Sequence, residues 1–148
     1  MQKSRLRAAI LNAANRNAAL VIKNAKIVNV FTEEIIEGDV AMRDGIIIGV
    51  GEYTGRVEID AKGGYLCPGL MDGHVHIESS MAHPTRFANV ILEKGTTSII
   101  ADPHEIANVC GSDGIQYMLD QTEWLPLSVF VMVPSCVPAT AFETSGAK

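Results

Sequence analysis

The chain has 148 residues, of which 47% are hydrophobic and 20% charged, a composition typical of globular protein rather than of a disordered segment. Its 17 acidic and 12 basic residues give a net charge of −5, which argues against a nucleic-acid backbone or an anionic membrane surface as the partner. No stretch approaches the roughly 18 apolar residues of a membrane span. We therefore expect a cytoplasmic protein that acts on a small molecule.

The amino-terminal residues 1–18 are predicted to form a short helix. Leu6, Ile10 and Ala13 recur at helical spacing after Ser4, and arginines occupy the positions between them. The arginines interrupt the apolar run, so this segment does not read as a signal peptide. A solvated basic face is the simplest interpretation of the helix.

Residues 19–64 alternate β-branched and polar side chains between turn-forming residues, which predicts a small antiparallel β unit. The Asp44-Gly45 dipeptide is a strong signal for a hairpin. The predicted strands are Leu20–Ile22, Lys26–Val30, Gly38–Met42 and Ile46–Val50. This segment has no histidine, and its carboxylates lie in turns or on the polar side of strands, so we expect no chemistry there.

The pattern changes near Gly63-Gly64, which predicts a domain boundary there and an α/β domain over residues 65–148. Apolar strands now alternate with amphipathic helices, as in a parallel sheet that is covered by helices. The predicted elements are a strand at Leu66–Ile77, a helix at Thr85–Lys94, a strand at Thr96–Ala101, a helix at Asp113–Trp124 and a strand at Leu127–Val133.

Polar side chains collect where these three strands end. They are His74, His76 and Glu78 after the first strand, Asp102, His104 and Glu105 after the second, and Ser135, Cys136 and residues 140–145 after the third. The carboxyl ends of parallel strands meet at one edge of a sheet, and this edge is where α/β proteins bind ligands and metals. We therefore expect the functional site at this edge.

His74 and His76 are the strongest candidates for metal ligands. Side chains at positions i and i+2 of a strand point to the same face, so both imidazoles can bind one ion. Each candidate can also have a purely structural role. The histidine pair can be packed or on the surface, Asp102, His104 and Glu105 can cap the next helix, and Glu78 can be an exposed loop carboxylate.

The cysteines point to no metal site. Cys67, Cys110 and Cys136 are odd in number and widely spaced, so they read as reduced thiols. His76-Ile77-Glu78 matches the His-x-Glu half of the zinc nucleobase deaminase signature, but the Pro-Cys-x-x-Cys half is missing. We therefore reject that fold.

A family resemblance rests on the motif Pro-Gly-Leu-Met-Asp-Gly-His-Val-His at residues 68–76, which follows the small β unit. It resembles the opening of the amidohydrolase superfamily, metal-dependent hydrolases with a (β/α)8 barrel and an accessory β-sandwich. Within that superfamily, residues 77–81, 101–109 and 133–139 are similar to the bacterial adenine deaminase family. The resemblance spans roughly residues 19–147 and implies the amino-terminal part of such a barrel, preceded by a small β-sandwich unit.

The resemblance also implies a chemistry, the hydrolytic deamination of adenine to hypoxanthine and ammonia. His74 and His76 would bind the first ion of a binuclear site, with manganese or iron expected and zinc less so. Glu78 would accept a hydrogen bond from a purine N–H group. Asp102, His104 and Glu105 would hold an auxiliary metal or order the first ligands.

The barrel is expected to be incomplete in this chain, because a (β/α)8 barrel needs about 250 residues and eight strands. The remaining ligands and the catalytic residues would come from later strands, and we do not assign Glu143 as the bridging carboxylate. We expect an amino-terminal fragment without turnover of its own, which associates as a homo-oligomer or through exposed barrel edges.

Two other interpretations remain open at the level of the sequence. Another amidohydrolase, such as a dihydroorotase or hydantoinase relative that acts on cyclic amides, would share the His-x-His strand. A non-catalytic β/α module would use the same histidines for structure alone.

Overall fold

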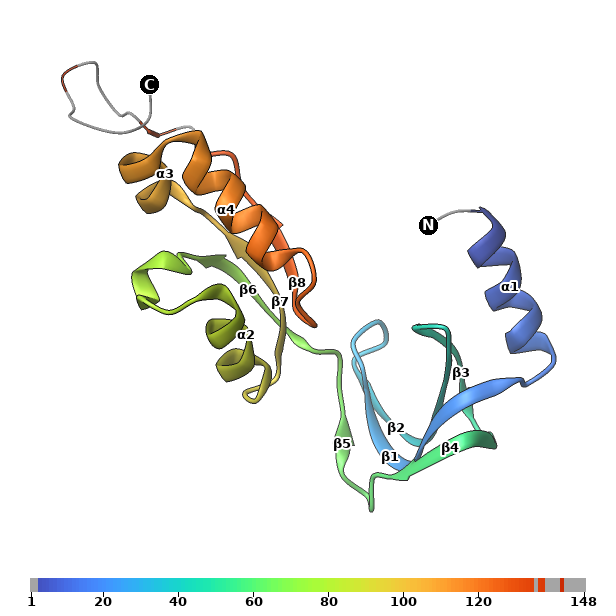
Figure 1. The fold of residues 1–148 in the computed structure, drawn as a ribbon. Coiled ribbons are helices and arrows are strands. Elements are labelled where there is room, and N and C mark those ends of the chain that lie inside the picture. The colour runs from blue at the N-terminus through green and yellow to red at the C-terminus, as the bar shows by residue number, and fades with distance from the viewer. Residues whose placement is uncertain (1–2, 135, 138–141, 143–148) are drawn as a thin grey trace. The chain divides into compact units, whose positions relative to one another are not determined.

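A computed structural model describes residues 3–134, 136–137 and 142 of the chain (Figure 1). The chain divides into two compact units, Met1–Pro68 and Gly69–Lys148. In the described part of the chain, no helix is long and apolar enough to cross a membrane.

The first unit contains one helix and a five-stranded sheet with the strand order β3-β2-β1-β4, in which β5 also pairs with β1. Its elements are α1 (Lys3–Ala14), β1 (Ala18–Asn29), β2 (Glu34–Arg43), β3 (Ile46–Gly51), β4 (Gly55–Asp60) and β5 (Tyr65–Leu66). The predicted hairpin is confirmed, because β2 and β3 pair antiparallel across Asp44 and Gly45, both of which have positive φ angles.

The prediction of a wholly antiparallel unit is wrong. Strands β1 and β2 are antiparallel, but β4 and β5 both run parallel to β1. The two short strands predicted at 20–22 and 26–30 fall, except for Val30, in the single strand β1, whose register shifts between Ile22 and Ala25. Asn24 lies at this irregularity with a φ of 54°.

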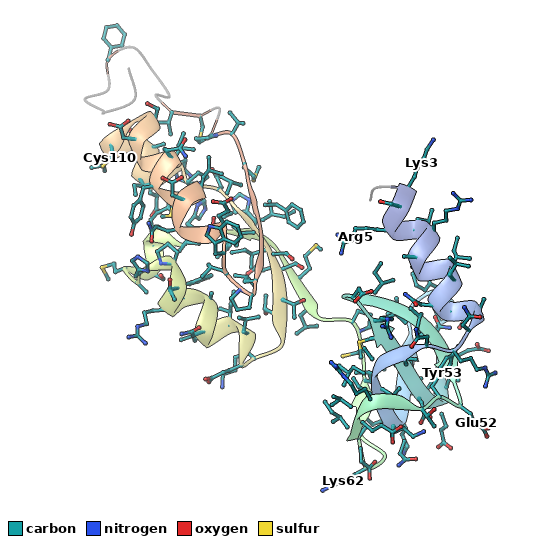
Figure 2. The ribbon with its side chains drawn as sticks, turned by 45° about the vertical axis from the view of Figure 1, so that its right-hand side comes forward. Lys3, Arg5, Glu52, Tyr53, Lys62 and Cys110 are labelled. Atoms are coloured by element: carbon teal, nitrogen blue, oxygen red, sulfur yellow. The ribbon has the colours of Figure 1, made fainter. Side chains whose placement is uncertain are left out.

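Helix α1 is present as predicted, but its apolar side is not buried. None of its residues is buried, and Leu6 and Ile10 are 47% and 59% exposed. Ala13 packs against the core cluster of the unit, which comprises Ala18, Val21, Ala41 and Ile48. Figure 2 shows the basic side chains of Lys3 and Arg5 extending away from the helix.

Asp39 organises the polar part of the first unit. Its carboxylate accepts hydrogen bonds from Lys23 Nζ and from the backbone N–H groups of Asn24 and Tyr53, both at 3.2 Å. Lys23 Nζ also donates to the carbonyl of Tyr53, which is labelled in Figure 2, at 2.7 Å. The hydrogen bond from Lys23 holds the pKa of Asp39 below its ordinary value of 3.8, and the same bond raises the pKa of Lys23 above 10.5.

The second unit is a parallel sheet with the strand order β6-β7-β8, which confirms the predicted α/β arrangement. Its elements are β6 (Leu70–Val75), the 3-10 helix η1 (Glu78–Ser80), α2 (Pro84–Leu92), β7 (Thr96–Ala101), α3 (His104–Cys110), α4 (Ser112–Thr122) and β8 (Ser128–Val131). Strand β7 has the predicted bounds. Helix α3 was not predicted, because seven residues are too few to display a helical period.

The single strand predicted at 66–77 is in fact two strands. Tyr65 and Leu66 form β5 and pair with β1 in the first unit, whereas β6 begins at Leu70. The units therefore divide after Pro68, a few residues later than the change of pattern at Gly63-Gly64 suggested. Pro68 has no N–H group to donate to a ladder, which fits its place between the two strands.

The core of the second unit lies between the sheet and its helices. It comprises Ile77, Ala88, Ile99, Ala101, Met118 and Leu127. Ile99 and Ala101 come from β7, Ala88 from α2 and Met118 from α4, so both helices pack on the central strand. This packing fixes the carboxyl ends of β6 and β7, where the histidines lie.

Candidate metal centre

His74 and His76 meet at the end of β6. Asp72 pairs with Ile99 and Val75 with Ala101, so β6 contains one more residue than β7 over this span, which is a β-bulge. His74 lies within this bulge and His76 directly after β6, and their Nε2 atoms lie 3.2 Å apart. The two ring planes are nearly perpendicular, at 74°, with centroids 4.9 Å apart. The structure thus brings together the pair that the spacing of the sequence singled out.

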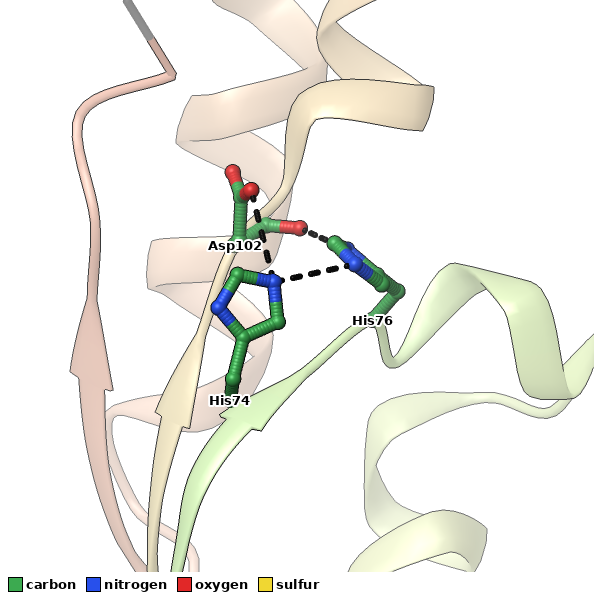
Figure 3. A group of neighbouring side chains, drawn as sticks. All are labelled: His74, His76 and Asp102. Atoms are coloured by element: carbon green, nitrogen blue, oxygen red, sulfur yellow. Dashed lines mark hydrogen bonds and ion pairs between the residues drawn. The ribbon is translucent and has the colours of Figure 1, made fainter.

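Asp102 follows β7 and completes a cluster with the two histidines (Figure 3). Its backbone N–H donates to the carbonyl of Val75 at 2.9 Å, which ties it to β6. Its Oδ2 atom lies 3.8 Å from Nε2 of His74. The potential ligand atoms of His74, His76 and Asp102 all lie within 4.8 Å of one another.

The hydrogen bond of His76 fixes which of its nitrogens carries the proton. Nδ1 of His76 lies 2.7 Å from the backbone oxygen of Asp102, a contact drawn in Figure 3. A carbonyl oxygen only accepts, so Nδ1 of His76 is the donor. In a neutral imidazole, Nε2 then keeps its lone pair and can bind a metal, and metal-binding histidines are commonly oriented in this way.

Asp102 is the residue whose surroundings are least complete. Its side chain is 13% exposed, and its Oδ1 atom is buried without a hydrogen-bond partner among the described residues. Leaving a buried polar atom without a partner costs about 1–3 kcal/mol. A cation at this carboxylate would remove the cost.

The donor set fits a divalent metal ion. Two imidazole nitrogens and a carboxylate are ligands that zinc, manganese and iron all accept. Two nitrogens bound to one ion at about 2.0–2.1 Å lie about 3.0–3.4 Å apart. The separation of 3.2 Å between the two Nε2 atoms falls in this range.

Glu78 and Glu105 lie near the cluster but are not part of it. Glu78 Oε1 accepts a hydrogen bond from the backbone N–H of Ile106 in the first turn of α3, at 3.3 Å. Glu105 Oε2 accepts one from the hydroxyl of Ser79 at 2.7 Å. The carboxylate of Glu78 thus reaches from η1 to α3, and the carboxylate of Glu105 reaches from α3 to η1. A negative charge at the start of a helix is also electrostatically favourable.

His104 is the first residue of α3 and contacts the cluster from outside. Its Nδ1 lies 3.1 Å from Oδ2 of Asp102, and its ring centroid lies 4.6 Å from that of His76. The remaining histidine, His83, lies elsewhere in the unit. Its Nδ1 accepts a hydrogen bond from the backbone N–H of Thr85 and so caps the start of α2.

The edge after the third strand is only partly described. Ser135, residues 140–141 and residues 143–145, which include Glu143, lie outside the described residues. Cys136 is described and is exposed, and it is free of any disulfide, like Cys67 and Cys110. The three cysteines therefore stand as the free thiols that were predicted.

Sequence reasoning missed the contacts that the backbone makes. The carbonyl of Asp102 orients His76, and the N–H of Ile106 binds Glu78 across 28 positions of the chain. Backbone groups leave no trace in residue identity, so no signal pointed to them. The cap on α2 did leave one, because His83 directly precedes Pro84, a residue favoured in the first turn of helices.

The comparisons with known proteins identify the family of this parallel-sheet unit. Residues 65–148 match the Amidohydrolase family, and this match covers more than half of the chain. The chain therefore belongs to the amidohydrolase family. A solved L-hydantoinase (dihydropyrimidinase) from Arthrobacter aurescens shares the fold, with a TM-score of 0.61 and 22% identity over 82% of this chain and 29% of that protein.

Curated relatives are more similar in sequence. An adenine deaminase of Geobacillus kaustophilus is 62% identical over 91% of this chain, and one of Clostridium acetobutylicum is 59% identical over 89%. An adenine deaminase of Halalkalibacterium halodurans is 54% identical over 97% of the chain. The matches cover 23%, 23% and 25% of these proteins, so the chain spans about a quarter of their length.

Proposed function

We propose that this chain provides the first metal-binding strands of an enzyme that hydrolyses adenine to hypoxanthine and ammonia. The observation that carries the proposal is the convergence of His74 and His76 beside the buried carboxylate of Asp102. The identity of 54–62% to proteins named adenine deaminase supports this choice of reaction. The activity is proposed for the protein made from its complete natural reading frame.

His74 and His76 would hold the ion through their Nε2 atoms, with Asp102 supplying a negative charge. Manganese or iron is the metal we propose. When bound, such an ion would supply a strong nucleophile from water near neutral pH, which the poorly electrophilic C6 position of adenine requires. The contribution of the chain is to hold the two Nε2 atoms 3.2 Å apart and, through the hydrogen bond of His76 to the backbone of Asp102, to leave Nε2 of His76 unprotonated.

Glu78 is proposed to bind the purine. Its Oε1 atom is bonded to the N–H of Ile106, which holds the carboxylate in place and leaves Oε2 for a further donor. A purine N–H group can donate to that oxygen, whereas a substrate carboxylate would be repelled. Glu78 would thereby favour a nucleobase over an anionic cyclic amide.

We further propose that residues 65–148 contain, from the start of β6 at Leu70 onward, the first three β/α units of a (β/α)8 barrel that this chain does not complete. The parallel order β6-β7-β8 and the fold shared with the hydantoinase support this proposal. Residues 1–18 and 19–64 would be an amino-terminal helix and an accessory β domain, the latter part of a sandwich. The other metal ligands and the catalytic residues are placed on strands outside this chain.

Two assays, one for ammonia release and one for the ring-opened product of a cyclic amide, test the proposal. Adenine, dihydroorotate and hydantoin would be offered, with added manganese or iron, to this chain and to a version extended through its natural downstream reading frame. We expect adenine deamination by the extended version alone. Ring opening of a cyclic amide without deamination would overturn the choice of reaction, and turnover of adenine by the 148-residue chain would overturn the split of the site.

A further inference from the structure

His104 is placed to control the carboxylate of Asp102. Its Nδ1 lies 3.1 Å from Oδ2 of Asp102, and because an ionised carboxylate only accepts, Nδ1 of His104 is the donor. The other contact to Oδ2, from Nε2 of His74, is 3.8 Å long and is too long for a hydrogen bond. Among the described residues, His104 therefore makes the one side-chain hydrogen bond that this carboxylate accepts.

The main chain of Asp102 is fixed by other means. Its N–H donates to Val75, and its carbonyl accepts from His76. These two bonds hold the backbone between β6 and β7 but do not set the rotation of the carboxylate. The direction in which Oδ1 points therefore depends on the bond from His104 to Oδ2.

His104 is not needed to hold its own helix. Helix α3 has Pro103 as its N-cap residue and lacks a side-chain cap bond. The helix is joined to η1 by Glu78, which accepts from Ile106, and by Glu105, which accepts from Ser79. The side chain of His104 is 34% exposed, so removing its ring leaves no closed cavity.

We propose that His104 is a positioning residue, whose Nδ1–H group holds the Asp102 carboxylate in its place beside the metal bound by His74 and His76. This inference rests on the proposed metal site and deepens it. It gives His104 a role distinct from ligation, because His104 is not among the three residues whose ligand atoms group together. Residues that orient a metal ligand typically change metal affinity by 10–100-fold when they are replaced.

The test compares two amides that differ only in where they place the donor. In His104→Asn the amide nitrogen lies near the position of Nδ1, whereas in His104→Gln it lies near the position of Nε2. The protein from the complete reading frame is stripped of metal and titrated with Mn²⁺, and the free ion is followed by electron paramagnetic resonance. His83→Gln, which alters a histidine outside the cluster, is the control.

We expect His104→Asn to bind Mn²⁺ within about threefold of the unsubstituted protein and His104→Gln to bind about 10–100-fold more weakly. Unsubstituted affinity in His104→Gln, or an equal loss in both folded variants, overturns the inference. Failure of the unsubstituted protein to bind Mn²⁺ overturns the proposed metal site itself. The two failures are therefore distinguishable.

A second readout needs neither a variant nor a metal. In the metal-free protein labelled with ¹⁵N-histidine, two-bond nitrogen–proton correlations report which nitrogen carries the proton. We expect the Nδ1–H form for His104 and for His76. An Nε2–H form of His104 would overturn the inference even if the variants failed to fold.

Discussion

Each unit of the chain holds a poorly exposed aspartate, and the two carboxylates differ in how completely they are bonded. Asp39 accepts from one ammonium group and two backbone N–H groups, so both of its oxygens have partners. Asp102 accepts from His104 on one oxygen and has no described partner on the other. A carboxylate whose bonds are complete stabilises the fold, whereas a buried oxygen without a partner calls for one, and a bound ion would supply it.

Replacing the two histidines is expected to have the largest effect. The double substitution His74→Asn and His76→Asn removes two strong ligands, so we expect metal content to fall below detection and deamination to be lost in the complete protein. Elemental analysis after metal loading measures this. His83→Asn is the control, and unchanged metal content in the double variant would favour the non-catalytic interpretation.

Asp102→Asn and Asp39→Asn should separate the two aspartates. Asp102→Asn removes the charge of an incompletely bonded carboxylate, so we expect metal affinity to fall at least tenfold while the metal-free protein keeps its stability. Asp39→Asn removes a charged acceptor from three donors, so we expect a loss of about 1–3 kcal/mol in the free energy of unfolding. Urea unfolding and metal titration of both variants measure the contrast. Equal destabilisation by both substitutions would contradict the distinction between the two aspartates.

The Asp39 cluster also predicts how stability depends on pH. The hydrogen bond from Lys23 lowers the pKa of Asp39 in the folded state, so the stabilisation is present above the unfolded pKa near 3.8 and is lost as the pH falls through the folded value. The pKa of Lys23 is raised, so its contribution is present below 10.5 and is lost as the pH rises through the folded value.

The midpoints of urea unfolding, measured between pH 2 and 7, test the predicted loss of stability at acid pH. We expect the midpoint to fall most steeply below pH 4 and Asp39→Asn to flatten this fall. Asp44→Asn, at an exposed turn, is the control. If Asp39→Asn left the fall of the midpoint below pH 4 unchanged, other carboxylates would dominate the loss of stability in acid.

The smallest expected effect concerns self-association of the 148-residue chain. Strand β8 lies at the end of the order β6-β7-β8, and its Phe130 is 57% exposed. We expect this edge to pair between chains, so that Phe130→Ser weakens association a few-fold in sedimentation velocity. Phe31→Ser, which alters a phenylalanine that is 94% exposed in the first unit, is the control, and equal effects of both changes would argue against a role for β8.

The sequence predicted those features that a local pattern fixes. The strand at Thr96–Ala101, the Asp44-Gly45 turn and the meeting of His74 with His76 follow from the two-residue period of strands and from turn chemistry. The parallel pairing of β4 with β1 was missed, because the direction of pairing depends on where the chain crosses and not on residue type.

The remaining features of the site depend on contacts between distant residues. Glu78 binds the backbone of Ile106, and the carbonyl of Asp102 sets the proton of His76. Neither contact involves a pair of side chains that a spacing could reveal. The sequence placed Asp102, His104 and Glu105 in one group, and only the structure separates the carboxylate that joins the histidines from the one that binds Ser79.

The central claim is that the two histidines and Asp102 form a metal site and that the Asp39 cluster does not. Crystals of the complete protein grown with Mn²⁺ would test it through an anomalous difference map at the manganese edge. We expect a peak within about 2.0–2.3 Å of both Nε2 atoms of His74 and His76 and none at Asp39. A map with manganese bound elsewhere and no peak at the histidines would contradict the account.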